Sequence, residues 1–160
     1  MIGWTAFLVI ICILAATRPS TATPESKRYD TFEKTFEIRL AKAIIRLVGT
    51  RYKFGGTSLR GVDCSGAVYY LFKTAGKPIP RMSAWKMHSL YGKGYHYSRS
   101  RKYDLVWWTI TPRRPYGHVG VMDGDHKHFW HSSSRKGFCQ DAFKEGRYWD
   151  KFFADCGKIK

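Results

Sequence analysis

The sequence reads VDCSG over residues 62–66, which places a cysteine at the first position of a predicted helix. Asp63 is a typical helix-capping residue, and Gly76 is a typical residue for ending a helix. Between them, apolar side chains recur on one face, as expected of a helix that packs on a core: Val68, Leu71, Phe72 and Ala75. The sequence therefore predicts a helix over 64–75 with Cys64 in its first turn.

The first turn of a helix favours a reactive cysteine. Its backbone N–H groups lack partners and the positive end of the helix dipole lies there, so this position stabilises a thiolate and lowers the thiol pKa. The N–H of Cys64 is also a natural donor to an oxyanion. A single cysteine is often only a small buried hydrophobic residue. Here the polar neighbours Asp63 and Ser65, and the glycines at 55, 56 and 61, favour the catalytic interpretation.

A cysteine nucleophile needs a general base, usually histidine, and the base needs an orienting partner. Of the six histidines, His118 and His131 flank a predicted hairpin. A turn centred between residues 124 and 125 pairs these two histidines directly. A tight Asp123-Gly124 turn instead pairs His118 with Phe129 and leaves His131 as a diagonal neighbour. In either register both histidines lie on one face of the sheet, so we predict His118 as the base and His131 as its partner.

The remaining pattern predicts helices first and strands second. Apolar residues at helical spacing predict a packing helix over 33–48, and Ser83 begins a shorter helix that ends near residue 90. Residues 91–98, rich in Gly and Tyr, are predicted to form a loop. Aromatic and β-branched residues then predict strands over 105–110, 119–122 and 129–131. This order predicts one α+β domain.

The N-terminus predicts export. Residues 4–16 form an uncharged apolar run, and Ser20-Thr21-Ala22 fits the small-x-small pattern of a signal-peptidase site. The run is shorter than the roughly 20 residues of a membrane-spanning helix, so we expect cleavage rather than an uncleaved anchor. We divide the chain into a signal peptide over 1–22, a polar tether over 23–35 and a catalytic domain over 36–160. The expected location is the periplasm, the cell envelope or the medium.

The charge balance predicts anionic partners. Lys and Arg number 28 against 12 Asp and Glu, a formal net charge of +16. The basic residues are scattered and match no groove-reading module, so we expect no nucleic acid partner. We expect an anionic envelope polymer or membrane surface instead, and no cofactor.

Three cysteines remain after the predicted signal peptide. In an oxidising compartment Cys139 and Cys156 could pair and leave Cys64 for chemistry. Two unpaired buried thiols are an equally good interpretation, because spacing alone does not show that they approach each other.

Several motifs, taken in order, resemble the NlpC family of cell-wall cysteine endopeptidases over about residues 36–135. They are GTRYKFGG at 49–56, VDCSG at 62–66, PRMS at 80–83, DLVWW at 104–108, HVGV at 118–121 and, finally, His131. The resemblance implies a papain-like α+β fold, with the cysteine helix packed on a small antiparallel sheet. It also implies hydrolysis of amide bonds in peptidoglycan stem peptides through a thioester.

The resemblance implies a role for individual residues. Cys64 matches the nucleophile, His118 the base and His131 the third, polar member. Tyr52 matches a tyrosine beside the nucleophile that helps to hold the oxyanion, although a packed aromatic is nearly as good an interpretation. The matched substrate-binding positions are Asp63, Ser65, Arg81 and Ser83.

The chain also departs from the family pattern. Lys86 stands where the family often has glutamine, Tyr103 where a glycine is usual, and residues 111–115 are arginine-rich. These departures bear on the choice of substrate more than on the chemistry.

Three other interpretations stay open. An acyltransferase or deamidase on the same scaffold is one, although lipid-acting relatives tend to carry the histidine before the cysteine, and here Cys64 precedes His118. Zinc bound by Cys64 and both histidines, or by the acidic and histidine residues of the hairpin tip, is disfavoured, because structural zinc sites use close-spaced ligand pairs. We therefore expect no metal. The third is a non-catalytic, cationic envelope-binding protein or toxin.

Overall fold

The structure, a computed structural model, describes residues 23–159. The predicted signal peptide lies outside the described residues. Among residues 23–159, no helix combines the length and the apolar character that crossing a membrane requires.

Two helices support the site. Helix α1 spans Pro24–Leu47, and helix α2 spans Cys64–Ala75 as predicted. Asp63 caps the start of α2, because its carboxylate accepts from the Gly66 N–H. Gly76 caps the end of α2, and its left-handed backbone conformation suits glycine. The shorter helices are α3 Ala84–Tyr91, the 3-10 turn η1 Tyr97–Arg99 and α4 Tyr148–Lys151.

Six strands form one antiparallel sheet in the order β3-β8-β4-β5-β6-β7. Their bounds are β3 Gly92–Tyr95, β4 Leu105–Trp108, β5 His118–Met122, β6 His128–Ser133, β7 Gly137–Ala142 and β8 Phe153–Gly157. A separate two-stranded sheet, β1 Thr57–Ser58 and β2 Gly61–Val62, precedes α2. Helices packed against an antiparallel sheet confirm the predicted α+β class.

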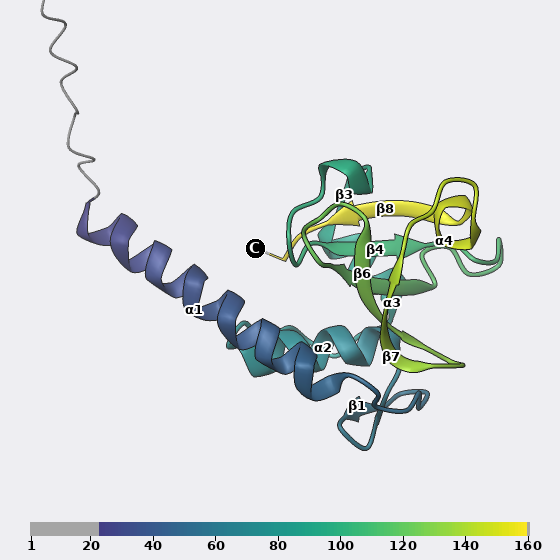
Figure 1. Cartoon of the computed structure of the whole chain (residues 1–160), viewed down its shortest axis with the longest axis horizontal. Coiled ribbons are helices and arrows are strands. Elements are labelled where there is room, and N and C mark those ends of the chain that lie inside the picture. Colours follow the sequence, from purple (N-terminus) through teal and green to yellow (C-terminus); the bar gives the residue numbers. More distant parts are fainter. Residues whose placement is uncertain (1–22, 160) are drawn as a thin grey trace, which may run out of the picture.

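Strand β4 shows how the sheet is buried on both faces. Leu105 and Trp107 join the core that includes α1 and α2, whereas Val106 and Trp108 join a second core on the other face. This alternation follows from the two-residue period of a strand. Figure 1 shows α1 and α2 side by side on one side of the sheet, with the first half of α1 projecting beyond it. The start of α2 is therefore held against the middle of the sheet.

Residues 23–35, predicted as a polar tether, comprise the cap and the first turns of α1. The Thr23 hydroxyl caps the helix by accepting from the Ser26 N–H at 3.2 Å, and Pro24 occupies the first turn, where proline is favoured. The described structure thus corrects the expected helix start at residue 33. The polar composition belongs to an exposed helical segment, because burial begins only at Phe36.

The loop predicted over 91–98 contains strand β3 and the turn η1. Gly92 and Tyr95 pair with β8, a strand that we did not predict. The Tyr97 ring stacks on Phe143 with centroids 3.8 Å apart, so this segment covers the second core rather than the cleft. Strand β7 was also missed, because neither β7 nor β8 shows a long apolar run.

The hairpin register matches neither prediction. Gly120 pairs with His131, which places His118 two residues away from the position opposite His131. The turn is longer than expected, because the Asp125 carboxylate accepts from the N–H groups of Lys127 and His128 and closes a loop there. A shift of two residues keeps both histidines on one face, so the predicted contact survives.

Cys139 and Cys156 do not form a disulfide, so the interpretation with two unpaired thiols is the one that the structure supports. Cys139 and Cys156 are free thiols, on strands β7 and β8. Three other strands lie between these two in the sheet, far beyond the reach of an S–S bond.

Candidate active site

Cys64 is the first residue of α2, and a network around Asp63 holds it there. The Asp63 carboxylate accepts from the N–H groups of Gly55 and Gly66 at 2.8 and 2.6 Å. It also accepts from the Ser65 hydroxyl at 3.0 Å and from the Arg81 guanidinium at 2.7 Å. Gly66 must lack a side chain, because a Cβ there would lie 1.9 Å from the Gly56 carbonyl oxygen. The loop and the helix start are thereby locked together.

Cys64 opens into a cleft of about 1120 Å³. All five residues that were predicted around the nucleophile line this cleft with it: Tyr52, Asp63, Ser65, Arg81 and Ser83. Arg81 also donates to the Ser65 hydroxyl at 2.8 Å, so it orients both polar residues of this wall. Lys86 does not line the cleft, whereas the arginine-rich segment does, through Arg113 and Arg114.

The environment of Cys64 opposes the thiolate. Burial raises the pKa of the thiol to about 11, and the Asp63 carboxylate adds to the rise. The N–H groups of Val119, Ser65 and Cys64 itself lower this pKa, but by less than burial raises it. The expected net lowering of the Cys64 pKa by the helix start is therefore wrong: the helix N–H groups act as predicted and are outweighed.

The two predicted histidines are in contact. Nε2 of His118 lies 2.9 Å from Nδ1 of His131, which leaves Nδ1 of His118 as the nitrogen that can serve Cys64. His118 adjoins Val119, whose N–H lies at the Cys64 sulfur. Within residues 23–159, no hydrogen bond joins that sulfur to the His118 ring. Such bonds are commonly long in free enzymes and tighten when substrate binds.

Both histidines are held neutral. Burial, followed by the neighbouring His131, lowers the pKa of His118 to about 3. Burial also lowers the pKa of His131, and the Asp141 carboxylate opposes that shift. Trp149 packs against both rings, stacked on His118 at 5.5 Å and edge-on to His131 at 4.7 Å. These pKa directions favour an uncharged Cys64 thiol and an uncharged His118 imidazole at neutral pH.

Asp141, which we did not predict, continues the hydrogen-bonded line of side chains that runs from His118 to His131. Its Oδ2 lies 3.1 Å from Nε2 of His131, and Lys136 donates to its Oδ1 at 2.8 Å. Burial would raise the pKa of Asp141, but the hydrogen bonds from Lys136 and His131 hold it below its ordinary value. The carboxylate is therefore charged and favours the His131 tautomer with its proton on Nε2.

Comparison with known proteins identifies the chain's relatives. A family model described as the NlpC/P60 family matches residues 49–157. The chain belongs to this family. The matched region includes Cys64, both histidines and Asp141.

Two curated relatives of the NlpC/P60 family illustrate the similarity. A probable endopeptidase NlpC homolog of Haemophilus influenzae is 34% identical over 121 residues, which cover 75% of this chain and 61% of that protein. The murein DD-endopeptidase MepS/murein LD-carboxypeptidase of Escherichia coli is 32% identical over 114 residues, which cover 69% of this chain and 56% of that protein. The chain thus spans less than two thirds of the length of these relatives.

Solved NlpC/P60 structures share the fold. An NLP/P60-family protein of Staphylococcus aureus superposes with a TM-score of 0.65 at 21% identity, over 79% of this chain and 42% of that one. The peptidoglycan hydrolase RipB of Mycobacterium tuberculosis gives a TM-score of 0.62 at 21% identity, over 81% of this chain and 67% of that one. These likenesses confirm the papain-like α+β fold.

Proposed function

We propose that this NlpC/P60 chain is an exported cysteine peptidase that hydrolyses amide bonds in peptidoglycan stem peptides. The observation that carries the proposal is a cysteine thiol at a helix N-terminus, in a large cleft, at the Val119 N–H of strand β5. The first residue of that strand, His118, is hydrogen-bonded to His131. The names of the curated relatives, murein and NlpC endopeptidases, support the substrate class.

The mechanism is acyl transfer in two steps. His118 takes the Cys64 proton on Nδ1 as the sulfur attacks the amide carbon, and His131 fixes the ring of His118. The oxyanion rests on the Cys64 N–H and the Tyr52 hydroxyl, and one such donor is typically worth about 100- to 1000-fold in rate. His118 then protonates the leaving amine, and water hydrolyses the thioester.

The test is digestion of purified peptidoglycan, with the released fragments identified by mass spectrometry. A peptidase releases fragments with a new amine and a new carboxyl end within the stem peptide. An acyltransferase or deamidase releases none, and a binding protein sediments with the wall without cutting it. Fragments without new stem-peptide ends, or none at all, would contradict the proposal.

The raised pKa of the Cys64 thiol predicts how its reactivity depends on pH. With a thiol pKa of about 11, the thiolate fraction is small at neutral pH and grows as pH rises. Alkylation of Cys64 by iodoacetamide should therefore accelerate about tenfold per pH unit between about pH 7 and 10. Peptide mass mapping follows the rate, with urea-unfolded protein as the reference for an ordinary thiol. A rate that is flat across neutral pH would indicate a thiolate–imidazolium pair instead.

We propose that the wall of the cleft formed by Arg113 and Arg114 binds a carboxylate group of the stem peptide. Arg113 and Arg114 line the cleft, and neither forms an ion pair within residues 23–159. Their segment is anchored, because Tyr116 stacks on His88 with centroids 3.4 Å apart and its N–H donates to the Thr109 hydroxyl. Two unpaired guanidinium groups in a held position suit a carboxylate.

Arg113→Gln/Arg114→Gln is expected to raise KM about 5- to 10-fold for stem peptides with free carboxylates, because charge-assisted hydrogen bonds are lost. For the same peptides with amidated carboxyl groups, KM should change little. Steady-state kinetics on matched synthetic peptides measure both values. Arg28→Gln on α1, outside the cleft, removes a like charge and serves as the control. Equal effects on both peptides would contradict carboxylate recognition.

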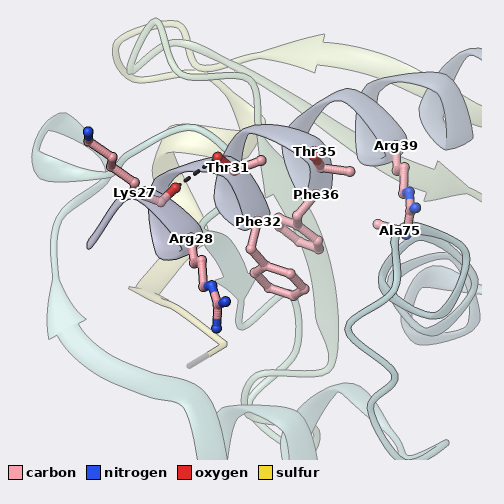
Figure 2. Close-up of a pocket in the computed structure, with 8 residues that line it drawn as sticks. All are labelled: Lys27, Arg28, Thr31, Phe32, Thr35, Phe36, Arg39 and Ala75. Atoms are coloured by element: carbon pink, nitrogen blue, oxygen red, sulfur yellow. Dashed lines mark hydrogen bonds between the residues drawn. The ribbon is translucent and has the colours of Figure 1, made fainter. Parts of the chain in front are cut away.

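We further propose that the basic surface holds the protein on an anionic envelope polymer. Figure 2 shows three basic side chains of α1, Lys27, Arg28 and Arg39, around a pocket that Phe32 and Phe36 also line. The net charge of +16 supports a non-specific electrostatic attraction. Retention on isolated walls should fall as salt rises, whereas salt-independent retention would contradict this proposal.

A further inference from the structure

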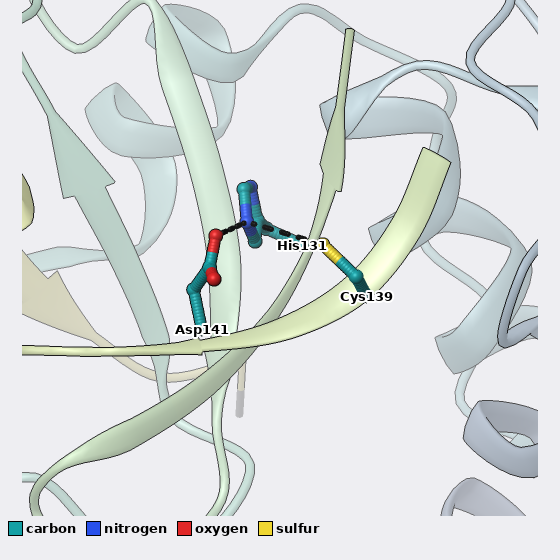
Figure 3. A group of neighbouring side chains, drawn as sticks. All are labelled: His131, Cys139 and Asp141. Carbon is teal, nitrogen blue, oxygen red and sulfur yellow. Dashed lines mark hydrogen bonds and ion pairs between the residues drawn. The ribbon is translucent and has the colours of Figure 1, made fainter. Parts of the chain in front are cut away.

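Three potential metal ligands meet where strands β6 and β7 pair, and one of them is His131 of the histidine pair. Cys139 lies directly opposite His131 in the strand register, and Asp141 lies two residues further along, on the same face of β7. Figure 3 shows both side chains of β7 directed at the His131 ring. Nε2 of His131 is 3.1 Å from Oδ2 of Asp141 and 3.7 Å from Sγ of Cys139, and the three ligand atoms all lie within 4.8 Å of one another.

The two separations from Nε2 of His131 are close to those around a tetrahedral zinc ion. Bond lengths of about 2.3 Å to sulfur and about 2.0 Å to nitrogen or oxygen place the nitrogen about 3.5 Å from the sulfur and about 3.3 Å from the oxygen. The observed distances differ from these by a few tenths of an ångström. Hydrogen bonds to the atoms that would not bind the metal also suit a metal site, because they orient its ligands. His118 is hydrogen-bonded to Nδ1 of His131, and Lys136 donates to Oδ1 of Asp141.

We propose that His131, Cys139 and Asp141 form an inhibitory zinc site that controls the hydrolase. The site can be reached from solvent, because Asp141 lines a pocket of about 530 Å³ together with His118 and Lys136. That pocket offers room for a water molecule as the fourth ligand. Binding requires the Cys139 thiol to release its proton, as thiol ligands do.

Inhibition follows from the tautomers, and this step rests on the proposed function. Without metal, His131 donates from Nε2 to Asp141 and accepts at Nδ1 from Nε2–H of His118, so Nδ1 of His118 is free to take the Cys64 proton. Zinc on Nε2 of His131 places that ring's proton on Nδ1, which then donates to His118. The proton of His118 must then lie on its Nδ1. Each ring keeps one proton, solvent receives only the Cys139 proton, and His118 can no longer act as a base.

The first test measures binding without activity. Cobalt(II), a spectroscopic substitute for zinc, is titrated into untagged Cys64→Ala protein, in which the candidate nucleophile cannot bind metal. We expect one equivalent to produce thiolate-to-cobalt charge-transfer absorption, and zinc to abolish it. Adding Cys139→Ser should remove the absorption, whereas adding Cys156→Ser should not, because that thiol lies in the second core. Absorption that is absent, or that survives Cys139→Ser, would overturn the site.

The second test measures inhibition. Zinc should inhibit the wild-type enzyme, and a chelator should reverse the inhibition. Cys139→Ser should keep its zinc-free activity and need at least about 10- to 100-fold more zinc for inhibition, because losing even an outer contact of a metal site costs that much affinity. Equal zinc sensitivity of the two proteins would show that metal acts at Cys64 and would overturn the inference. The cobalt result separates the two proposals, because an inactive protein with a Cys139-dependent cobalt signal refutes the hydrolase and retains the site.

Discussion

Cys64→Ala protein is expected to lose about 10⁴-fold or more of its turnover of stem peptides, which is the scale seen when a nucleophile that works as a unit with its base is removed. Without the sulfur no thioester can form, and the oxyanion donors at Cys64 and Tyr52 have no intermediate to stabilise. Release of new amine ends from a synthetic stem peptide measures the loss.

A matched control makes this result specific. Cys139→Ala removes another partly buried free thiol of the described chain and should leave turnover nearly unchanged. Both variants should melt within about 2 °C of the wild type, since neither residue is fully buried. Turnover that persists in Cys64→Ala protein would refute the assignment of the nucleophile.

His118→Gln is expected to lower kcat about 10²- to 10⁴-fold, because the same ring accepts the thiol proton and later protonates the leaving amine. The loss should appear in kcat more than in KM, since His118 moves protons and does not hold the peptide. Single-turnover measurements on a synthetic stem peptide separate these steps. A change confined to KM would contradict the role of base.

Asp141→Ala is expected to lower kcat less than His118→Gln does. Asp141 acts only through His131, so its removal should cost about tenfold in kcat, the equivalent of one hydrogen bond of about 1.4 kcal/mol. A loss as large as that of His118→Gln would mean that Asp141 contributes far more than orientation.

Local chemistry made part of the site predictable. Helix α2 could be placed from its cap, its apolar face and Gly76, because these signals act within a few residues. The contact between His118 and His131 was predictable despite a wrong register, because a shift of two residues preserves the face of a strand. The family motifs added Tyr52 and Arg81, which line the cleft beside Cys64.

The sequence by itself determined the α+β class, the cysteine at the helix start and the pair of histidines, since each depends on short-range periodicity or capping. Only the tertiary structure decided that β7 brings Asp141 and Cys139 to His131, because strand pairing across a hairpin depends on a register that turn length sets. It also decided the charge state of Cys64. The helix start favours the thiolate locally, but burial and the Asp63 carboxylate outweigh it, and burial depends on residues distant in the chain.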